Sequence, residues 1–179
     1  MSDRKWMPRP PRGAERVTGK TFTERKLLLV DAVLSDCDLS NLVVHGGSLR
    51  RVEIAGSRLV GFSFTESEAE DVRISDATLM LASFGHTRMH RVVFDGVNLR
   101  EASFVGADLR GVVFDGCAME GADFRNAKLT GCTLRGATLD GVLGVEFLRG
   151  LSMPPADIVE SAAALAGALG IEVERPDPD

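Results

Sequence analysis

The sequence has 179 residues with 26 Asp or Glu and 21 Lys or Arg, and its net charge at pH 7 is −5. This length suits one domain, and the acidic balance argues against general binding of nucleic acid. No apolar stretch is long enough to cross a membrane, and the basic, proline-rich N-terminus lacks the apolar core of a signal peptide. We therefore expect a cytoplasmic protein that binds neither membranes nor nucleic acid directly.

The first segment, residues 1–21, is predicted to be a basic, proline-rich arm. Its first 20 residues hold six Lys or Arg against two acids, together with Pro8, Pro10, Pro11 and the only tryptophan, Trp6. This composition predicts an extended arm that behaves as a flexible tail. The alternative is that Trp6 binds a partner or covers the first coil of the domain that follows.

An apolar residue recurs at every fifth position from Leu29 to Leu139, which gives 23 consecutive matches. The position two residues before each of these centres is mostly small or apolar and never charged, and 11 of the 19 glycines lie two residues after a centre. The order inward, outward, inward is a strand pattern, and Gly tolerates the backbone of a tight turn. Each pentapeptide therefore predicts a short strand followed by a corner.

Pentapeptides such as ADLRG at residues 107–111 and ADFRN at residues 122–126 resemble the repeats of the pentapeptide repeat family. The resemblance implies an all-β solenoid over residues 22–143, a right-handed four-sided β-helix with four repeats per coil, in which residues 20 apart stack. The sequence supports this coil length, because side-chain types sort into columns of that spacing. One predicted core column consists of Phe64, Phe84, Phe104 and Phe124. At a strand spacing of about 4.8 Å, roughly six coils give a rod of about 27 Å.

The side chains that fill such a rod leave no room for a substrate. Cys37, Cys117 and Cys132 occupy the small inward phase, where they serve as compact apolar side chains. The sequence shows no nucleophile beside a base, no glycine-rich phosphate loop and no metal-ligand spacing. We therefore expect no catalytic, cofactor or metal site and infer that the protein is not an enzyme.

We number the four faces of the rod by their centre residues: face 1 contains Leu49, Ala69, Met89 and Leu109; face 2 contains Ile54, Ile74, Phe94 and Phe114; face 3 contains Leu59, Leu79, Leu99 and Met119; and face 4 contains the phenylalanine column. Outward residues on face 1 alternate in sign from coil to coil, as in Glu68, Arg88, Asp108 and Lys128. Opposite charges on neighbouring strands stabilise by about 0.2–1 kcal/mol per pair. Face 1 is therefore predicted to be a stabilising ladder, in which His90 needs no catalytic role.

Faces 2 and 3 together carry nine acidic residues against four arginines. Asp95 and Asp115 should lie one coil apart on face 2, while Val60, Met80 and Leu81 are apolar residues at outward positions of face 3. Acids beside exposed apolar side chains form a reasonable contact patch, although carboxylates on a flat, wet surface can also be only solvated. The predicted protein-binding residues are Asp36, Glu53, Asp76, Asp95, Asp115, Glu120, Val60, Met80 and Leu81.

Residues 144–179 are predicted to form a connector, a C-terminal capping α-helix and a tail. Pro154 and Pro155 suit a first helical turn, residues 156–169 are rich in Ala, and Gly170 suits the end of a helix. One face of this helix presents Ile158, Leu165 and Leu169. This face either covers the last coil, as the end of a solenoid requires, or forms a homodimer. The link and the helix are similar to the C-terminal cap of actinobacterial pentapeptide repeat proteins.

A rigid rod with distinct faces is suited to presenting surface, so the predicted function is that of a non-enzymatic protein-binding scaffold. The family resemblance adds an alternative, because some members bind DNA gyrase or topoisomerase IV as mimics of duplex DNA. The acidic side of the rod fits that role, whereas the charge ladder on face 1 and the basic arm do not. A purely structural scaffold is the second alternative.

Overall fold

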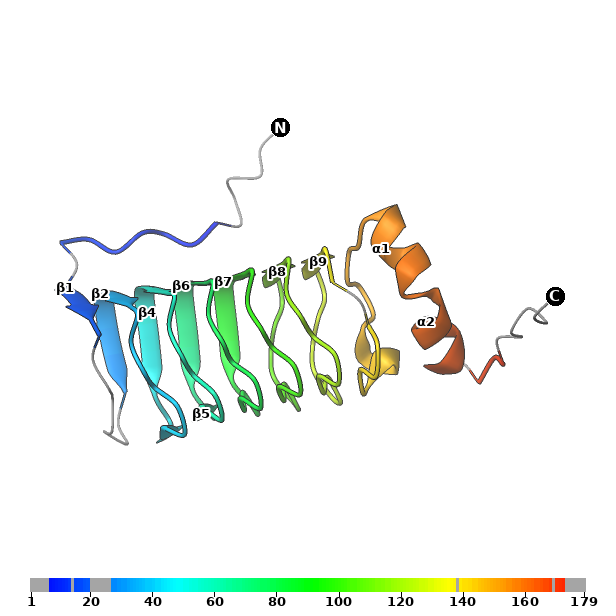
Figure 1. The fold of residues 1–179 in the computed structure, drawn as a ribbon, viewed down its shortest axis with the longest axis horizontal. Helices are drawn as coiled ribbons and strands as arrows, with labels where there is room; N and C mark the ends of the chain where they lie inside the picture. The colour runs from blue at the N-terminus through cyan, green and yellow to red at the C-terminus, as the bar shows by residue number, and fades with distance from the viewer. Residues whose placement is uncertain (1–6, 14, 20–26, 138, 169, 173–179) are drawn as a thin grey trace.

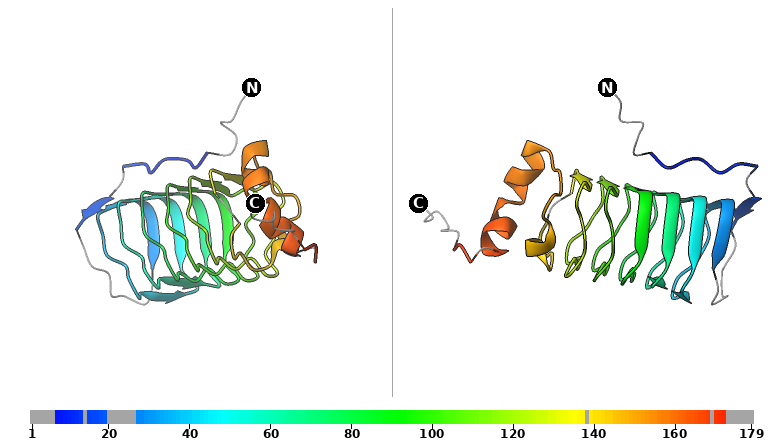
Figure 2. Two further views of the ribbon diagram at one scale, coloured as in Figure 1. Left: turned by 45° about the vertical axis from the view of Figure 1, so that its right-hand side comes forward. Right: turned by 180° about the vertical axis from the view of Figure 1, so that it is seen from behind.

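Successive coils of the chain stack on one another at a repeat of 20 residues (Figure 1). The computed structural model describes residues 7–13, 15–19, 27–137, 139–168 and 170–172. Over these residues the fold is a β-solenoid of about six turns with short C-terminal helices. Both views in Figure 2 show the coils as a straight rod, with β1 at one end and the helices at the other.

Seven parallel strands form the main sheet, which covers faces 1 and 2. In sheet order they are β1 (Glu15–Thr18), β2 (Leu28–Ser35), β4 (Ser48–Ala55), β6 (Glu68–Ser75), β7 (Arg88–Asp95), β8 (Val113–Asp115) and β9 (Thr133–Arg135). On face 4, β3 (Val43–His45) pairs with β5 (Ser63–Thr65). Isolated parallel bridges connect the coils on face 3, for example between Asp38 and Arg58. All four sides are therefore hydrogen-bonded from coil to coil.

The corners of the coils depend on a left-handed backbone that recurs every five residues. Each residue at this phase from Asp31 to Gly141 has a positive φ, including Leu81 at 58°. Bulky side chains rarely adopt this conformation, and glycine occupies it without strain. At Gly106 a side chain is also excluded by space, because a Cβ would lie 2.6 Å from the ring of His86 in the coil before. The corner side chain of one coil thus covers a glycine of the next.

The interior is filled by stacked aromatic and aliphatic side chains. Phe84, Phe104 and Phe124 stack face to face along face 4, with ring centroids 5.2 Å and 5.1 Å apart. Phe94 meets Phe104 edge to face at 6.2 Å, which joins the columns of faces 2 and 4. Phe64 is equally buried, but its ring stacks on Phe62 at 5.9 Å. Flat rings at the strand spacing allow the coils to approach closely.

The N-terminal segment differs from the predicted flexible tail. Strand β1 pairs in parallel with β2, so the sheet begins at Glu15, inside the segment predicted to be an arm. Residues 7–13 run along the rod over the strands β2 to β7 (Figures 1 and 2). Trp6, to which the alternative interpretation gave a role in binding a partner or covering the first coil, lies outside the described residues.

The single predicted C-terminal helix is instead two short helices, α1 (Pro155–Glu160) and α2 (Ala162–Ala168), which follow a 3-10 helix at Val145–Phe147. They meet at Ser161, which is fully buried. A short Ala-rich helix has little stability of its own, so its path follows its contacts with the last coil. Leu165 packs against the core, Ile158 is 45% exposed, and Leu169 lies outside the described residues.

The helical segment also closes the hydrogen-bond ladder at the end of the rod. The carbonyl oxygen of Ser152 accepts a hydrogen bond from the N–H of Leu134 at 2.9 Å. The carboxylate of Asp157 accepts one from the N–H of Gly136 at 2.7 Å. Leu148 and Leu151 pack against the core beside them. These contacts cover the last coil in the way that the end of a solenoid requires.

We predict that Phe104→Ala lowers the free energy of unfolding by about 3–5 kcal/mol, because it removes a fully buried ring that stacks on two others. Chemical denaturation measures the change. Leu81→Ala serves as the control, since Leu81 is 55% exposed, and its effect should stay within about 0.5 kcal/mol. Equal effects of the two substitutions would show that the phenylalanine column does not stabilise the rod.

We predict that deletion of residues 151–179 causes self-association, because it exposes the core side chains and backbone donors of the last coil. Light scattering measures the effect. Val159→Ser is the matched control within the helices, since Val159 is 75% exposed and should be replaceable without association. A truncated chain that stays monodisperse and as stable as the full chain would contradict the capping role.

Candidate functional site

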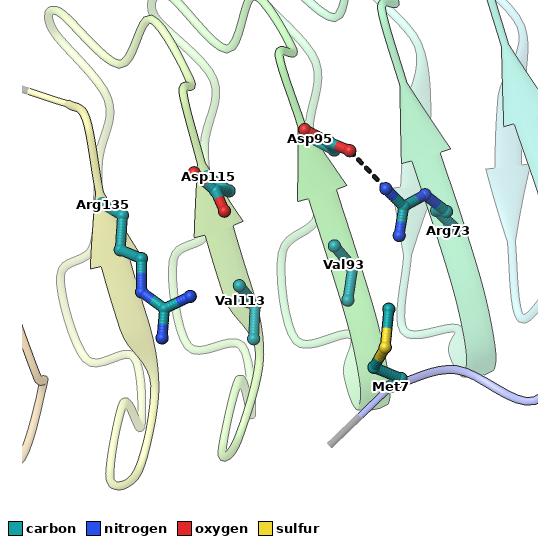
Figure 3. Close-up of a pocket in the computed structure, with 7 residues that line it drawn as sticks. All are labelled: Met7, Arg73, Val93, Asp95, Val113, Asp115 and Arg135. Carbon is teal, nitrogen blue, oxygen red and sulfur yellow. Dashed lines mark hydrogen bonds and ion pairs between the residues drawn. The ribbon is translucent and has the colours of Figure 1, made fainter. Parts of the chain in front are cut away.

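A pocket of about 240 Å³ lies on face 2, between the arm and the strands β6 to β9 (Figure 3). Two of the residues predicted to bind a protein, Asp95 and Asp115, line it. Arg73 and Arg135 stand at its two ends, so the charges along the rod follow the order positive, negative, negative, positive. The floor is apolar and consists of Val93 and Val113, with Met7 of the arm beside them.

The solenoid register produces this arrangement directly. Asp95 pairs in register with Asp115, and Asp115 with Arg135, so the three side chains lie on successive strands. Val93 and Val113 pair in the same way, two residues earlier in each strand. Because side chains two residues apart point to the same side of a strand, the valines and the acids share the outward face.

The two carboxylates of the pocket differ in their partners. Arg73 forms an ion pair with Asp95. Asp115 is exposed, and no residue of the described ranges forms an ion pair with it, although Arg135 is its register neighbour. Two acids one coil apart with only one paired arginine leave negative charge at the centre of the pocket. Such a site can accept a cationic side chain above an apolar floor.

A row of ion pairs at the corner between faces 1 and 2 orders two further carboxylates beside the pocket. Arg51 donates two hydrogen bonds of 2.6 Å to Asp31, and Arg91 donates in the same bidentate way to Asp71. The hydrogen bonds from Arg51 lower the pKa of Asp31 to about 2, with the backbone N–H of Arg12 as a further cause. The hydrogen bonds from Arg91 likewise lower the pKa of Asp71, which is 3% exposed. Both groups are therefore fixed anions at neutral pH.

The remaining predicted site residues are spread over the rod. Asp36 and Asp76 lie exposed at the corner between faces 2 and 3, and Glu53 is half-buried on face 2. Glu120 lies on face 3, where its carboxylate is 3.0 Å from Nε of Arg100. Val60 and Met80 are half-buried neighbours on face 3, and Leu81 is an exposed corner. Asp95 and Asp115 are the two that line the face 2 pocket.

Sequence reasoning did not identify the apolar part of this pocket. Val93 and Val113 occupy outward positions 20 residues apart, and this regularity was available as a signal. Val93 is only 7% exposed, whereas the other described members of its column, such as Glu53 and Val113, are half-buried. Met7 lies outside the repeats, so no periodicity could have placed it on the rod.

The charge ladder predicted on face 1 forms in part. Arg88 pairs with Glu68 at 2.8 Å and Arg50 with Glu70 at 3.6 Å, in each case one coil apart. Asp108 instead pairs within its own coil, with Arg110 at 2.6 Å. Exposed pairs of this kind contribute little to stability individually.

The repeat geometry and the family comparison agree. Residues 70–143 match the family model described as a pentapeptide repeat region. These residues are a pentapeptide repeat region within the solenoid. No curated protein matches it at a significant level. Within the described ranges, no group of three or more His, Cys, Asp or Glu side chains is placed to hold a metal ion, and no helix is both long and apolar enough to cross a membrane.

Several solved structures are similar to this chain. Rfr23 from the cyanobacterium Cyanothece 51142 is 20% identical over 69% of this chain and 88% of that chain, with a TM-score of 0.43. QnrB1, a plasmid-mediated fluoroquinolone resistance protein, is 18% identical over 89% and 100%, with a TM-score of 0.34. HetL from Nostoc sp. strain PCC 7120, which is involved in the regulation of heterocyst differentiation, is 18% identical over 82% and 92%, with a TM-score of 0.29.

We predict that none of the three cysteines reacts with a neutral alkylating reagent in the folded protein at pH 8. All three thiols are buried, and burial raises the pKa of Cys117 to about 11 and that of Cys132 to about 12, so little reactive thiolate forms. Mass spectrometry should show no adduct under native conditions and three adducts in denaturant. Rapid native labelling of Cys117 or Cys132 would contradict the packing of the core.

Proposed function

We propose that this pentapeptide repeat protein is a non-enzymatic scaffold that binds a protein partner through face 2. The pocket around Asp95 and Asp115 carries the proposal, because it joins an apolar floor to the exposed carboxylate of Asp115 on a rigid sheet. Interfaces gain affinity where an apolar contact excludes water around a charged pair. A pocket of this kind on a rod of stacked coils fits a protruding side chain of another protein.

The chemistry of the pocket specifies the kind of side chain. A lysine or arginine of the partner would lay its aliphatic stem on Val113 and place its charge at Asp115. Arg73 and Arg135 at the ends of the pocket would repel a second cation, which limits the site to one basic side chain. The partner therefore presents a basic surface with a protruding Lys or Arg.

A topoisomerase is a more specific candidate for this partner. This hypothesis comes from the family resemblance, and the charge of faces 2 and 3 supports it. Of their nine acids, Asp95 and Glu120 form ion pairs with arginines among the described residues, and the other seven leave the surface negative. A negative rod of stacked strands can occupy a groove that binds duplex DNA. The cytoplasmic location that this role requires is likewise a prediction.

We predict that Asp95→Lys with Asp115→Lys weakens binding of the partner at least tenfold, because it places cations against a basic surface. The tagged protein and its variants are compared for the proteins that they retain from a lysate of the host, at increasing salt. Glu68→Lys with Asp108→Lys is the matched control on face 1: it changes the charge equally and should lower stability but retain the partner. A partner kept by the face 2 variant and lost by the control would overturn the proposal.

Supercoiling by purified gyrase of the same host, with and without a quinolone, tests the topoisomerase hypothesis directly. Inhibition or protection that disappears in the face 2 variant supports it. No effect of the folded wild-type protein at any concentration would overturn the topoisomerase hypothesis and leave the general scaffold. Retention of no protein by any variant would instead favour the purely structural scaffold.

A further inference from the structure

The N-terminal arm is built to lie along the rod rather than to join its sheet. Between residues 8 and 12 the sequence reads Pro-Arg-Pro-Pro-Arg, so only Arg9 and Arg12 carry a backbone N–H. Proline-rich segments favour the extended polyproline II conformation, which has three residues per turn and a rise of about 3.1 Å. The N–H groups of Arg9 and Arg12 are three residues apart, and this conformation turns them to the same side.

Both of these donors bind the corner carboxylates described above. The N–H of Arg9 donates to Oδ1 of Asp71 at 3.1 Å, and the N–H of Arg12 donates to Oδ1 of Asp31 at 2.9 Å. Asp31 and Asp71 are two coils apart, a separation of about 10 Å at the strand spacing. Three residues of polyproline II span about 9 Å, which matches that separation. The repeat of the arm therefore fits the repeat of the rod.

Docking of the arm places Met7 on the floor of the face 2 pocket. In Figure 3 the arm crosses beside β7, and Met7 lies next to Val93 and Arg73. Val93 is 7% exposed although it points outward, and Met7 adds to the cover that its register neighbours Arg73 and Val113 give it. The thioether of Met7 thus covers apolar surface that a partner side chain would otherwise contact.

We propose that residues 7–12 form a strap that closes over the face 2 pocket and competes with a protein partner for its Val93–Val113 floor. The proposal rests on the binding function proposed above for the same pocket. Two backbone hydrogen bonds and one side chain hold the strap, so it can detach without any change in the rod. Asp31 and Asp71 stay in place after detachment, because Arg51 and Arg91 hold them.

The test uses the full chain with Val93→Cys, whose thiol lies under Met7. The native cysteines are buried, so Cys37, Cys117 and Cys132 contribute little to labelling. The rate of alkylation by iodoacetamide is compared with that of the same variant carrying Arg9→Pro and Arg12→Pro. These substitutions remove both N–H donors and preserve the polyproline II conformation. We expect the rate to rise about tenfold or more, as for loss of hydrogen bonds to a charged acceptor.

Two controls separate detachment from other effects. Arg9→Ala with Arg12→Ala removes the same two charges and keeps both N–H donors, so the rate at position 93 should stay within about twofold of the parent. A second control places a cysteine on face 4 by Ser103→Cys, and its rate of alkylation should be the same with and without Arg9→Pro and Arg12→Pro. The strap would be overturned if position 93 were alkylated at the same rate in the parent and the double proline variant. It would also be overturned if the double alanine variant raised that rate as much as the double proline variant does.

Binding of the partner then tests the competition. The variant with Arg9→Pro and Arg12→Pro should retain the partner about tenfold more tightly than the wild type, and equal affinity would overturn the competitive role. The alkylation experiment needs no partner, so the two proposals fail separately. If alkylation at position 93 is unchanged in the double proline variant, the strap is overturned, whether or not a partner binds. If alkylation rises but no variant retains a protein partner, only the scaffold function is overturned.

Discussion

The hydrogen bonding of each coil to its two neighbours is the interaction on which the rest of the structure depends. On face 3 the N–H of Leu39 donates to Arg58 of the next coil at 2.8 Å, and the N–H of Arg58 donates back to Cys37 at 2.9 Å. Because the chain advances by one strand spacing per coil, the strand residues of an interior coil bond to the coils above and below, and turn bonds such as that from the N–H of Ala102 to the carbonyl of Leu99 close the corners. The left-handed corners and the flat aromatic stacks are the conformations compatible with this spacing.

Because each coil is hydrogen-bonded to its neighbours, the coils at the two ends of the rod need other partners for their backbone groups. The N–H of Gly116 donates to the carbonyl of Arg135 at 2.8 Å, but the equivalent N–H of Gly136 has no further coil above it. The carboxylate of Asp157 accepts its hydrogen bond instead. A side chain of a helix thus substitutes for the backbone of the absent coil. At the other end of the rod, β1 pairs in parallel with β2, so the backbone of β2 has a hydrogen-bonding partner where no further coil precedes it.

The interior could be predicted from the sequence because one physical rule, the alternation of inward and outward positions around a repeating corner, decides each position separately. Columns such as Phe84, Phe104 and Phe124 follow from spacing alone. The same rule placed Asp95 and Asp115 side by side. It could not predict that Phe64 stacks on Phe62, which depends on rotamers, or that Ser161 divides the C-terminal helix. It also gave no position for Met7, because the arm follows no five-residue period and its place is set by contacts distant in sequence.

Inward positions of the repeat serve the structure, and outward positions are available for recognition. Inward residues must match their neighbours in adjacent coils, so a change at one coil strains the next. Outward residues contact mainly water, and the rod tolerates Arg or Val at the same phase of different coils, as at Arg73, Val93 and Val113. A pocket can therefore arise on face 2 without any disturbance of the core. The arm adds what a rigid rod lacks, a segment whose docking depends on a few hydrogen bonds and whose position can change while the coils remain fixed.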